Sequence, residues 1–87
     1  MIDVSSIGDD KFTVVVKERD SRAEYTVTLD DEYYRNLKLG GETKEKLIER
    51  SFQFLLEREP KESILSKFDL RIIGRYFHEY ESEIKRV

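Results

Sequence analysis

The spacing of apolar residues changes near residue 30, and this change constrains the fold more than any other feature of the sequence. Before it, apolar and polar residues alternate, so that Tyr25, Val27 and Leu29 share one face of an extended chain. After it, apolar residues recur every three or four positions, which is the spacing of an amphipathic helix. Because the strands precede the helices instead of alternating with them, the sequence predicts an α+β fold.

The N-terminal third of the chain predicts an antiparallel sheet. Residues 12–17 and 23–29 are rich in β-branched and aromatic side chains, and the polar segment between them predicts a hairpin turn. Ile2 and Val4 stand at strand spacing, so residues 2–7 are a candidate for a further strand, which the sequence alone leaves open. The expected sheet is a hairpin or meander of two or three strands with one apolar face, which three or four helices then cover.

A short helix is expected directly after the sheet. Asp30 or Asp31 can cap its N-terminus, because an aspartate side chain accepts a hydrogen bond from a free backbone N–H of the first turn. Gly40 and Gly41 predict its end, since glycine readily adopts the left-handed conformation that closes a helix.

Residues 43–58 predict the principal helix of the domain. Thr43 is its expected N-cap, and Pro60 stops it, because the residue before a proline is held out of helical conformation. Glu42 and Lys46 are expected to pair at the helical i,i+4 spacing. The apolar residues of this helix cover about half of its circumference, which predicts burial on two sides, by the sheet and by a further helix or a second subunit.

The C-terminal third predicts a short helical segment over residues 63–68 and a last helix over residues 70–84. Asp69 is the expected N-cap of the last helix, and Gly74 is the candidate for a bend within it. The apolar stripes of the two long helices form the expected core and interaction face, which consists of Leu47, Ile48, Phe52, Leu55, Leu56, Tyr76, Phe77 and Tyr80. Two such stripes in one small chain predict self-association as a homodimer.

The length of 87 residues predicts a single domain that spans residues 1–87. The sequence contains no cysteine, which excludes disulfides and leaves no thiolates for a structural zinc site. No apolar run approaches the ~18–20 residues that a membrane-spanning helix requires, and no signal peptide is recognised. The sequence therefore predicts a soluble cytoplasmic domain with no metal, no cofactor and no membrane partner.

Charged residues make up 40% of the chain, with 16 basic and 19 acidic side chains interleaved along it. Such a chain has no basic tract that would attract nucleic acid or anionic lipid by charge alone. Asn36 and Gln53 are the only side-chain amides. Few thermolabile residues among many interleaved charges form a composition typical of thermophilic prokaryotes, which is the expected source.

No combination of residues in the sequence predicts a catalytic centre. His78 is the only histidine and falls on the polar side of the last predicted helix, where a solvated side chain is expected. The acidic pairs Asp9–Asp10 and Asp30–Asp31 are explained as turn and capping residues, since adjacent side chains diverge. Without a nucleophile beside a base, we expect a protein that is not an enzyme.

Residues 24–59 follow the order strand, short helix, glycine turn and longer helix. With YTVTLD (residues 25–30) as the strand and GETKEKLIER (residues 41–50) as the start of the second helix, this segment resembles the ribbon-helix-helix repressors and antitoxins. The resemblance implies a dimer whose paired strands enter the DNA major groove. The DNA contacts that it implies belong to Thr26, Thr28, Thr43 and Lys44. The net charge of −3 argues against DNA, because phosphate neutralisation supplies much of DNA affinity.

A second resemblance covers more of the C-terminal part. The segments SFQFLLEREP (residues 51–60), SIL (residues 63–65), FDL (residues 68–70) and YFHEYE (residues 76–81) are similar to a set of short uncharacterised prokaryotic proteins, in which a proline stands at the position of His78. This resemblance implies an architecture and no activity. The leading expectation is a small non-enzymatic interaction module that acts through its helices, and the alternative is a ribbon-helix-helix DNA-binding regulator.

Overall fold

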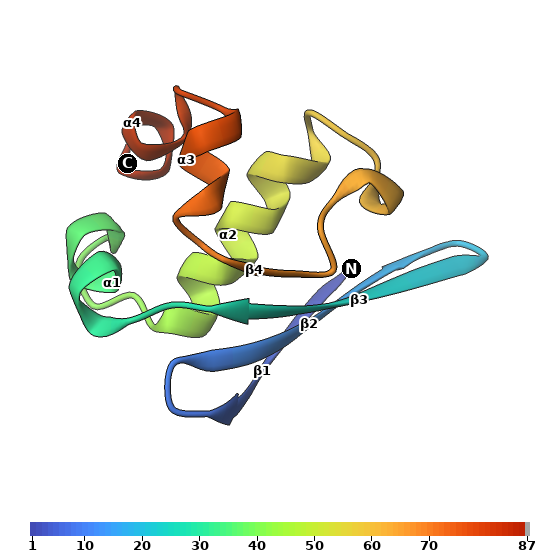
Figure 1. The fold of residues 1–87 in the computed structure, drawn as a ribbon, viewed down its shortest axis with the longest axis horizontal. Helices are drawn as coiled ribbons and strands as arrows, with labels where there is room; N and C mark the ends of the chain where they lie inside the picture. The colour runs from blue at the N-terminus through green and yellow to red at the C-terminus, as the bar shows by residue number, and fades with distance from the viewer. Residues whose placement is uncertain (87) are drawn as a thin grey trace.

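The computed structural model describes residues 1–86 and is an α+β domain (Figure 1). Its strands are β1 (Ile2–Gly8), β2 (Lys11–Glu18), β3 (Ser21–Thr28) and β4 (Lys67–Asp69). Its helices are α1 (Asp31–Leu37), α2 (Lys44–Leu56), α3 (Ile72–Tyr76) and α4 (Tyr80–Ile84), with a 3-10 turn, η1 (Lys61–Ser63). No helix within residues 1–86 has the length and apolarity to cross a membrane. The predicted α+β class and the N-terminal strand that the sequence left open are confirmed, but the sheet has 4 strands where two or three were predicted.

The strands form one sheet in the order β1-β2-β3-β4, with the first three in an antiparallel meander. The helices lie on one side of this sheet (Figure 1). Val4, Val14 and Tyr25 pair across the meander and point toward the helices, whereas Thr13 and Thr26 pair on the opposite, uncovered face. The alternation of apolar and polar residues therefore decides which face of the sheet the helices cover.

The fourth strand corrects the prediction for residues 63–68, which do not form a helical segment. η1 is a single 3-10 turn, and the chain then extends into β4, which lies parallel to β3. The N–H of Thr26 donates to the Ser66 carbonyl at 2.8 Å, and the N–H of Leu70 donates to the Thr28 carbonyl at 3.0 Å. β4 has only 3 residues, too few for a periodic pattern, and the free edge of β3 selects its conformation by hydrogen bonding.

The last helix predicted over residues 70–84 is in fact two short helices, α3 and α4. The chain is extended between them at Phe77, with φ −129° and ψ 98°. In a continuous helix residues 76 and 80 would share one face, whereas here Tyr76 is exposed and Tyr80 is fully buried. The Tyr80 ring packs edge-on against Phe54 of α2, with 5.2 Å between the ring centroids. A contact between distant segments thus favours the break, and the local sequence does not reveal it.

Asp69 and Gly74 also differ from their predicted roles. Asp69 is the last residue of β4, and its carboxylate accepts a hydrogen bond from the N–H of Arg71 at 3.0 Å. This bond turns the chain from the strand toward α3, which begins only at Ile72 and has no side-chain cap. Gly74 lies inside α3, and the bend follows it at Phe77, because the contacts of Tyr80 set the position of the break.

The predicted N-caps of α1 and α2 are confirmed, and one predicted ion pair is wrong. Asp30 and Thr43 each accept a hydrogen bond from an N–H of the first helical turn, at 2.9 and 3.1 Å respectively. Glu42 pairs with Arg50 and not with Lys46. Glu42 precedes the N-cap and is therefore outside the helix, so the i,i+4 geometry does not apply to it.

α2 is the centre of the hydrophobic core and is buried on two sides within one chain. Leu47 and Phe52 have no exposed surface, and the Phe52 ring centroid lies 5.1 Å from that of Tyr25 in the sheet. On another side of α2, the hydroxyl groups of Ser51 and Tyr80 are 2.7 Å apart. The second element that covers α2 is therefore α4, a further helix of the same chain.

Candidate functional site

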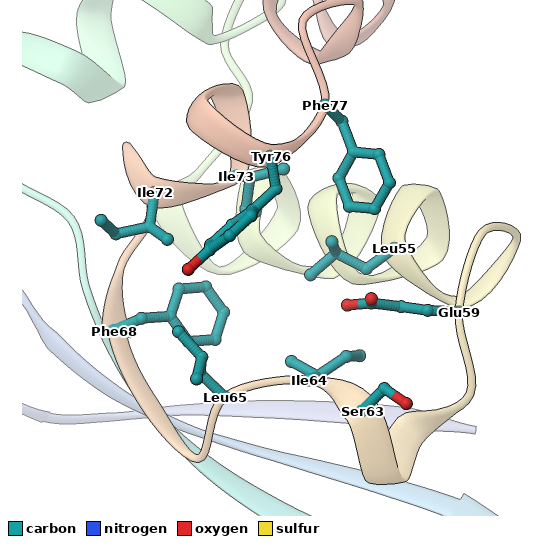
Figure 2. Close-up of a pocket in the computed structure, with 10 residues that line it drawn as sticks. All are labelled: Leu55, Glu59, Ser63, Ile64, Leu65, Phe68, Ile72, Ile73, Tyr76 and Phe77. Atoms are coloured by element: carbon teal, nitrogen blue, oxygen red, sulfur yellow. The ribbon is translucent and has the colours of Figure 1, made fainter.

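A hydrophobic groove opens between the C-terminal end of α2, the segment from η1 to β4, and α3 (Figure 2). Its volume is about 370 Å³. The floor of the groove consists of Leu55, Ile64, Phe68 and Ile73, all of which are buried. These four residues belong to the main hydrophobic core, so the packing that stabilises the domain also holds the floor in place.

Two large apolar side chains stand exposed at the rim of the groove. Tyr76 is 69% exposed and Leu65 is 51% exposed, although both line the recess. Figure 2 shows both of them gathered with Phe68 along one side of the opening, while Phe77 and Glu59 lie on the other side. Exposed aromatic and aliphatic side chains around a buried apolar floor are typical of a surface that binds a partner.

The irregular course of the chain after α2 creates the groove. Pro60 is extended, with φ −70° and ψ 156°, and η1 follows as a single turn that cannot cover the end of α2. α3 has only 5 residues before the chain extends at Phe77. Because both segments are short, the groove stays open beside the C-terminal end of α2, where Leu55 forms part of its floor.

Glu59 and Ser63 are the two polar residues of the lining. Figure 2 shows the Glu59 carboxylate directed across the groove toward its centre. Within residues 1–86 this carboxylate takes part in no ion pair, whereas the nearby Glu57 pairs with Arg58 at 3.4 Å. A free carboxylate beside an apolar floor is suited to a ligand that carries an apolar side chain next to a cation.

The predicted core and interaction face divides into a sealed part and an open part. The sealed part consists of Leu47, Ile48, Phe52 and Tyr80, which have no exposed surface. The open part consists of Leu55, Tyr76 and Phe77, which line the groove. Leu56 is partly buried against the core and lies outside the groove lining. The sealed part is not available to a partner while the domain stays folded.

Leu65, Ile72 and Glu59 line the groove but are not among the site residues that the sequence predicts. Leu65 reaches the groove because the chain is extended from η1 to β4, so no helical wheel groups it with Tyr76. Ile72 precedes Tyr76 by four residues in α3, so the two share a face of that helix. Glu59 directly precedes Pro60, and this position identifies it as outside the helix. The sequence pattern did not single out Glu59, and this position before proline is the local signal that could have drawn attention to it.

The strand residues that the ribbon-helix-helix resemblance assigns to DNA lie on the uncovered face of the sheet. Thr26 and Thr28 belong to β3, and the Thr28 hydroxyl donates to Asp69 at 2.8 Å. Both edges of β3 are paired within the chain, with β2 and with β4. A ribbon formed by β3 of two subunits would therefore require β4 to detach, and DNA binding stays a prediction that a duplex titration can test.

The helix residues that the same resemblance assigns to DNA are engaged in local contacts. Thr43 caps α2, and the Lys44 ammonium lies 2.7 Å from Asp10 and 2.6 Å from Asp31. The hydrogen bond from Lys44 holds the pKa of the Asp31 carboxyl below its usual range. A DNA phosphate at this position would have to compete with two carboxylates for the same ammonium group.

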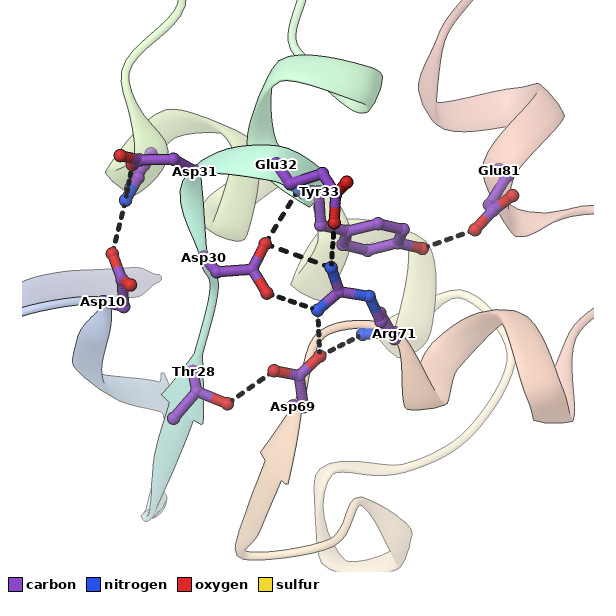
Figure 3. Close-up of polar contacts among 10 residues, drawn as sticks. Asp10, Thr28, Asp30, Asp31, Glu32, Tyr33, Asp69, Arg71 and Glu81 are labelled. Atoms are coloured by element: carbon purple, nitrogen blue, oxygen red, sulfur yellow. Dashed lines mark hydrogen bonds and ion pairs between the residues drawn. The ribbon is translucent and has the colours of Figure 1, made fainter.

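A polar cluster around Arg71 joins the end of β3, the start of α1 and the turn between β4 and α3 (Figure 3). The Arg71 guanidinium donates to Asp30 at 2.7 and 3.0 Å and to Asp69 at 3.5 Å. The hydrogen bonds from Arg71 and from the Tyr33 N–H lower the pKa of Asp30 to about 2. In this Arg71 cluster one guanidinium bonds the carboxylates of Asp30 and Asp69, and these bonds connect three segments of the chain.

Tyr33 and His78 are two side chains that can transfer protons, and neither lines the groove. The Tyr33 hydroxyl donates to Glu81 at 2.7 Å (Figure 3), and burial raises the pKa of Tyr33, so this phenol stays protonated near neutral pH. His78 is exposed, on the turn between α3 and α4. Within the part of the chain that the structure describes, no three His, Cys, Asp or Glu side chains converge as metal ligands.

Comparison of the chain with protein-family models, with curated proteins and with solved structures gives no match. Function is therefore inferred from the arrangement of the residues alone. Of the surfaces described above, the groove between α2, η1 and α3 combines a buried apolar floor, exposed apolar side chains and the carboxylate of Glu59, and it is the candidate functional site.

Proposed function

We propose that this domain is a non-enzymatic protein-interaction module and that its groove takes an apolar side chain of a protein partner. The observation that carries the proposal is the exposure of Tyr76 and Leu65 at the rim of a recess whose floor is fully apolar. Burying these side chains against a partner removes apolar surface from water, which contributes roughly 25 cal/mol per Å². Tyrosine is also enriched at protein interfaces, because it offers a large contact area and a polar tip.

The size and the polarity of the groove indicate the chemistry of the partner. Sites that bind compact ligands have volumes of roughly 300–1,000 Å³, and the volume of about 370 Å³ lies in the lower part of that range. This space fits one or two apolar side chains. Glu59 then favours an arginine or lysine next to them, because an unlike charge at the rim contributes to specificity and to the rate of association.

Nuclear magnetic resonance titrations with two matched synthetic peptides test this proposal. Both peptides carry a central phenylalanine and leucine, and the flanking residues are arginine in one and glutamate in the other. We expect the shift changes to concentrate on the backbone amides of Leu65, Tyr76 and Phe77, and the arginine peptide to bind more tightly. Absence of groove shifts for both peptides at millimolar concentration would contradict the proposal.

Substitutions in the groove separate its apolar contact from its preference for a cationic neighbour. Tyr76→Ser should weaken both peptides, because it removes apolar contact area from the rim. Glu59→Gln should remove the preference for arginine while the apolar contact stays. Ile7→Ser is the matched control, since Ile7 is 52% exposed on β1, outside the groove, and its loss should change neither titration.

A further inference from the structure

The two edges of the sheet differ in how they are protected against pairing with another strand. One edge is β4, which has 3 residues and carries a lysine, Lys67. The other edge is β1, which has 7 residues, contains no proline or lysine, and has no strand on its outer side within residues 1–86. Short strands and lysines are among the devices by which proteins protect an edge, and β4 has both of them. β1 has neither, and its bulge lies at its end, after Ser6, so residues 2–6 form an open edge.

The hydrogen bonds between β1 and β2 show which backbone groups of β1 are free. The amino group of Met1 donates to the Lys17 carbonyl at 3.0 Å, and the Lys17 N–H donates back to the Met1 carbonyl at 2.9 Å. In an antiparallel pair such doubly bonded positions alternate with positions whose groups point away from the neighbour. The N–H and C=O groups of Ile2, Val4 and Ser6 therefore point outward from the sheet edge.

The side chains of β1 are divided between the two faces of the sheet. Ile2 and Val4 lie on the helix-covered face, paired with Val16 and Val14, and are only partly buried because the sheet ends beside them. Asp3 and Ser5 lie on the uncovered face and are exposed. The regular register ends after Ser6, where a bulge precedes Gly8. The part of the edge that can pair is therefore residues 2–6.

We propose that β1 pairs antiparallel with β1 of a second copy of this chain, about a two-fold axis that passes beside Val4. Val4 then pairs with its own counterpart, and Ile2 pairs with Ser6 of the second copy, so that the outward backbone groups of all three residues are bonded. The two sheets join into one continuous sheet. The partly buried Ile2 and Val4 of both copies meet on the helix-covered face, where their remaining apolar surface is covered.

Charge and the bulge together select this register among the symmetric alternatives. With the axis beside Val4, each Asp3 lies opposite Ser5 of the second copy. An axis beside Asp3 would place two carboxylates opposite each other, which is destabilising. An axis beside Ser5 would place Ile2 opposite Gly8, beyond the bulge that ends the regular edge. The register beside Val4 is thus the one that bonds residues 2–6 of both copies without opposing like charges.

Substitutions of Ser5 test this register with opposite expected signs. Sedimentation equilibrium of the untagged chain, from micromolar to millimolar concentration, should show a reversible monomer–dimer equilibrium. Ser5→Lys places an ammonium opposite Asp3 twice per dimer and should lower the dissociation constant by a few-fold to about tenfold. Ser5→Asp places carboxylates opposite each other twice and should raise the constant by a similar factor.

Val4→Pro provides a second test, because proline removes the outward N–H at the centre of the proposed pairing. An edge strand tolerates proline where its N–H faces solvent, so the variant should still fold. It should leave the protein monomeric, with the fold checked by circular dichroism. A wild-type chain that stays monomeric at millimolar concentration overturns the proposal. The proposal is also overturned if the wild type dimerises but its dissociation constant is unchanged in Ser5→Lys, Ser5→Asp and Val4→Pro. If Tyr76→Ser then dissociates that dimer, the contact belongs to the groove, and the two proposals are distinguished.

Discussion

The two flanks of α2 carry the same kind of apolar side chain, but one is closed and the other is open. On the closed flank, Phe52 is fully buried against the sheet, and Ser51 is bonded to Tyr80 of α4. On the open flank, Leu55 forms part of a groove floor whose rim residue Tyr76 is exposed. The closed flank faces the 4-stranded sheet and α4, whereas the open flank faces α3, which has 5 residues. Apolar composition alone therefore does not decide whether a helix face becomes core or binding surface.

The largest expected effect lies on the closed flank. Phe52→Ala should lower the free energy of unfolding by about 3–5 kcal/mol, because it removes a buried ring and leaves a cavity that its neighbours cannot fill. Alanine is the better helix former, so a loss cannot come from helix propensity. Urea denaturation measures the difference, with Gln53→Ala on the exposed side of α2 as the control. A loss below about 1 kcal/mol would show that this flank is not closed.

An intermediate effect is expected from acid, which should loosen the attachment of α3, the wall of the open flank. The pKa of Asp30 is lowered from 3.8 to about 2 in the folded chain by its bonds to Arg71 and to a backbone N–H. A lowered pKa means that the folded state gains stability above pH 4 and loses it as the pH falls from about 4 to about 2. The melting temperature should therefore fall over this interval.

Asp30→Asn isolates the ionic part of this effect. Asparagine can still cap α1, but it carries no charge for Arg71, so the variant should lose less stability between about pH 4 and about pH 2 than the wild type. Asp20→Asn, in the turn between β2 and β3, removes an exposed carboxylate elsewhere and serves as the control. Equal losses in the wild type and in Asp30→Asn would contradict a role of Asp30 in acid stability.

The smallest expected effect lies on the open flank. Tyr76→Ser should change the free energy of unfolding by less than about 0.5 kcal/mol, because an exposed ring loses little by truncation. The same urea denaturation measures it, so that Tyr76→Ser and Phe52→Ala are compared directly. A loss above about 1 kcal/mol at micromolar concentration would mean that the groove is closed in solution, and the two flanks would then not differ as described.

The regular elements could be predicted because each depends on local signals. The alternation of Tyr25, Val27 and Leu29 predicts β3, and the capping residues Asp30 and Thr43 predict the starts of α1 and α2. In each case the residues that decide the conformation are neighbours in the chain. Capping bonds and alternating burial need no contact with a distant segment, and these predictions are confirmed.

The groove could be predicted only in part. Leu55, Tyr76 and Phe77 belong to the apolar face that the sequence identifies, but that face also contains residues of the sealed core. Leu65 joins them only because residues 67–69 form a strand beside β3. Whether an apolar residue is open or sealed depends on which distant segment covers it. The spacing of apolar residues along the chain does not reveal which segment that is.

The sequence by itself determined the order of strands and helices, the face of the sheet that is covered, and the wide apolar arc of α2. The tertiary structure alone decided that the chain forms β4 and that its last helix breaks at Phe77. Segments of three to five residues form too few internal hydrogen bonds to select their own conformation. The free edge of β3 and the surface of α2 select the conformation of these short segments. The groove lies where the short segments leave α2 uncovered.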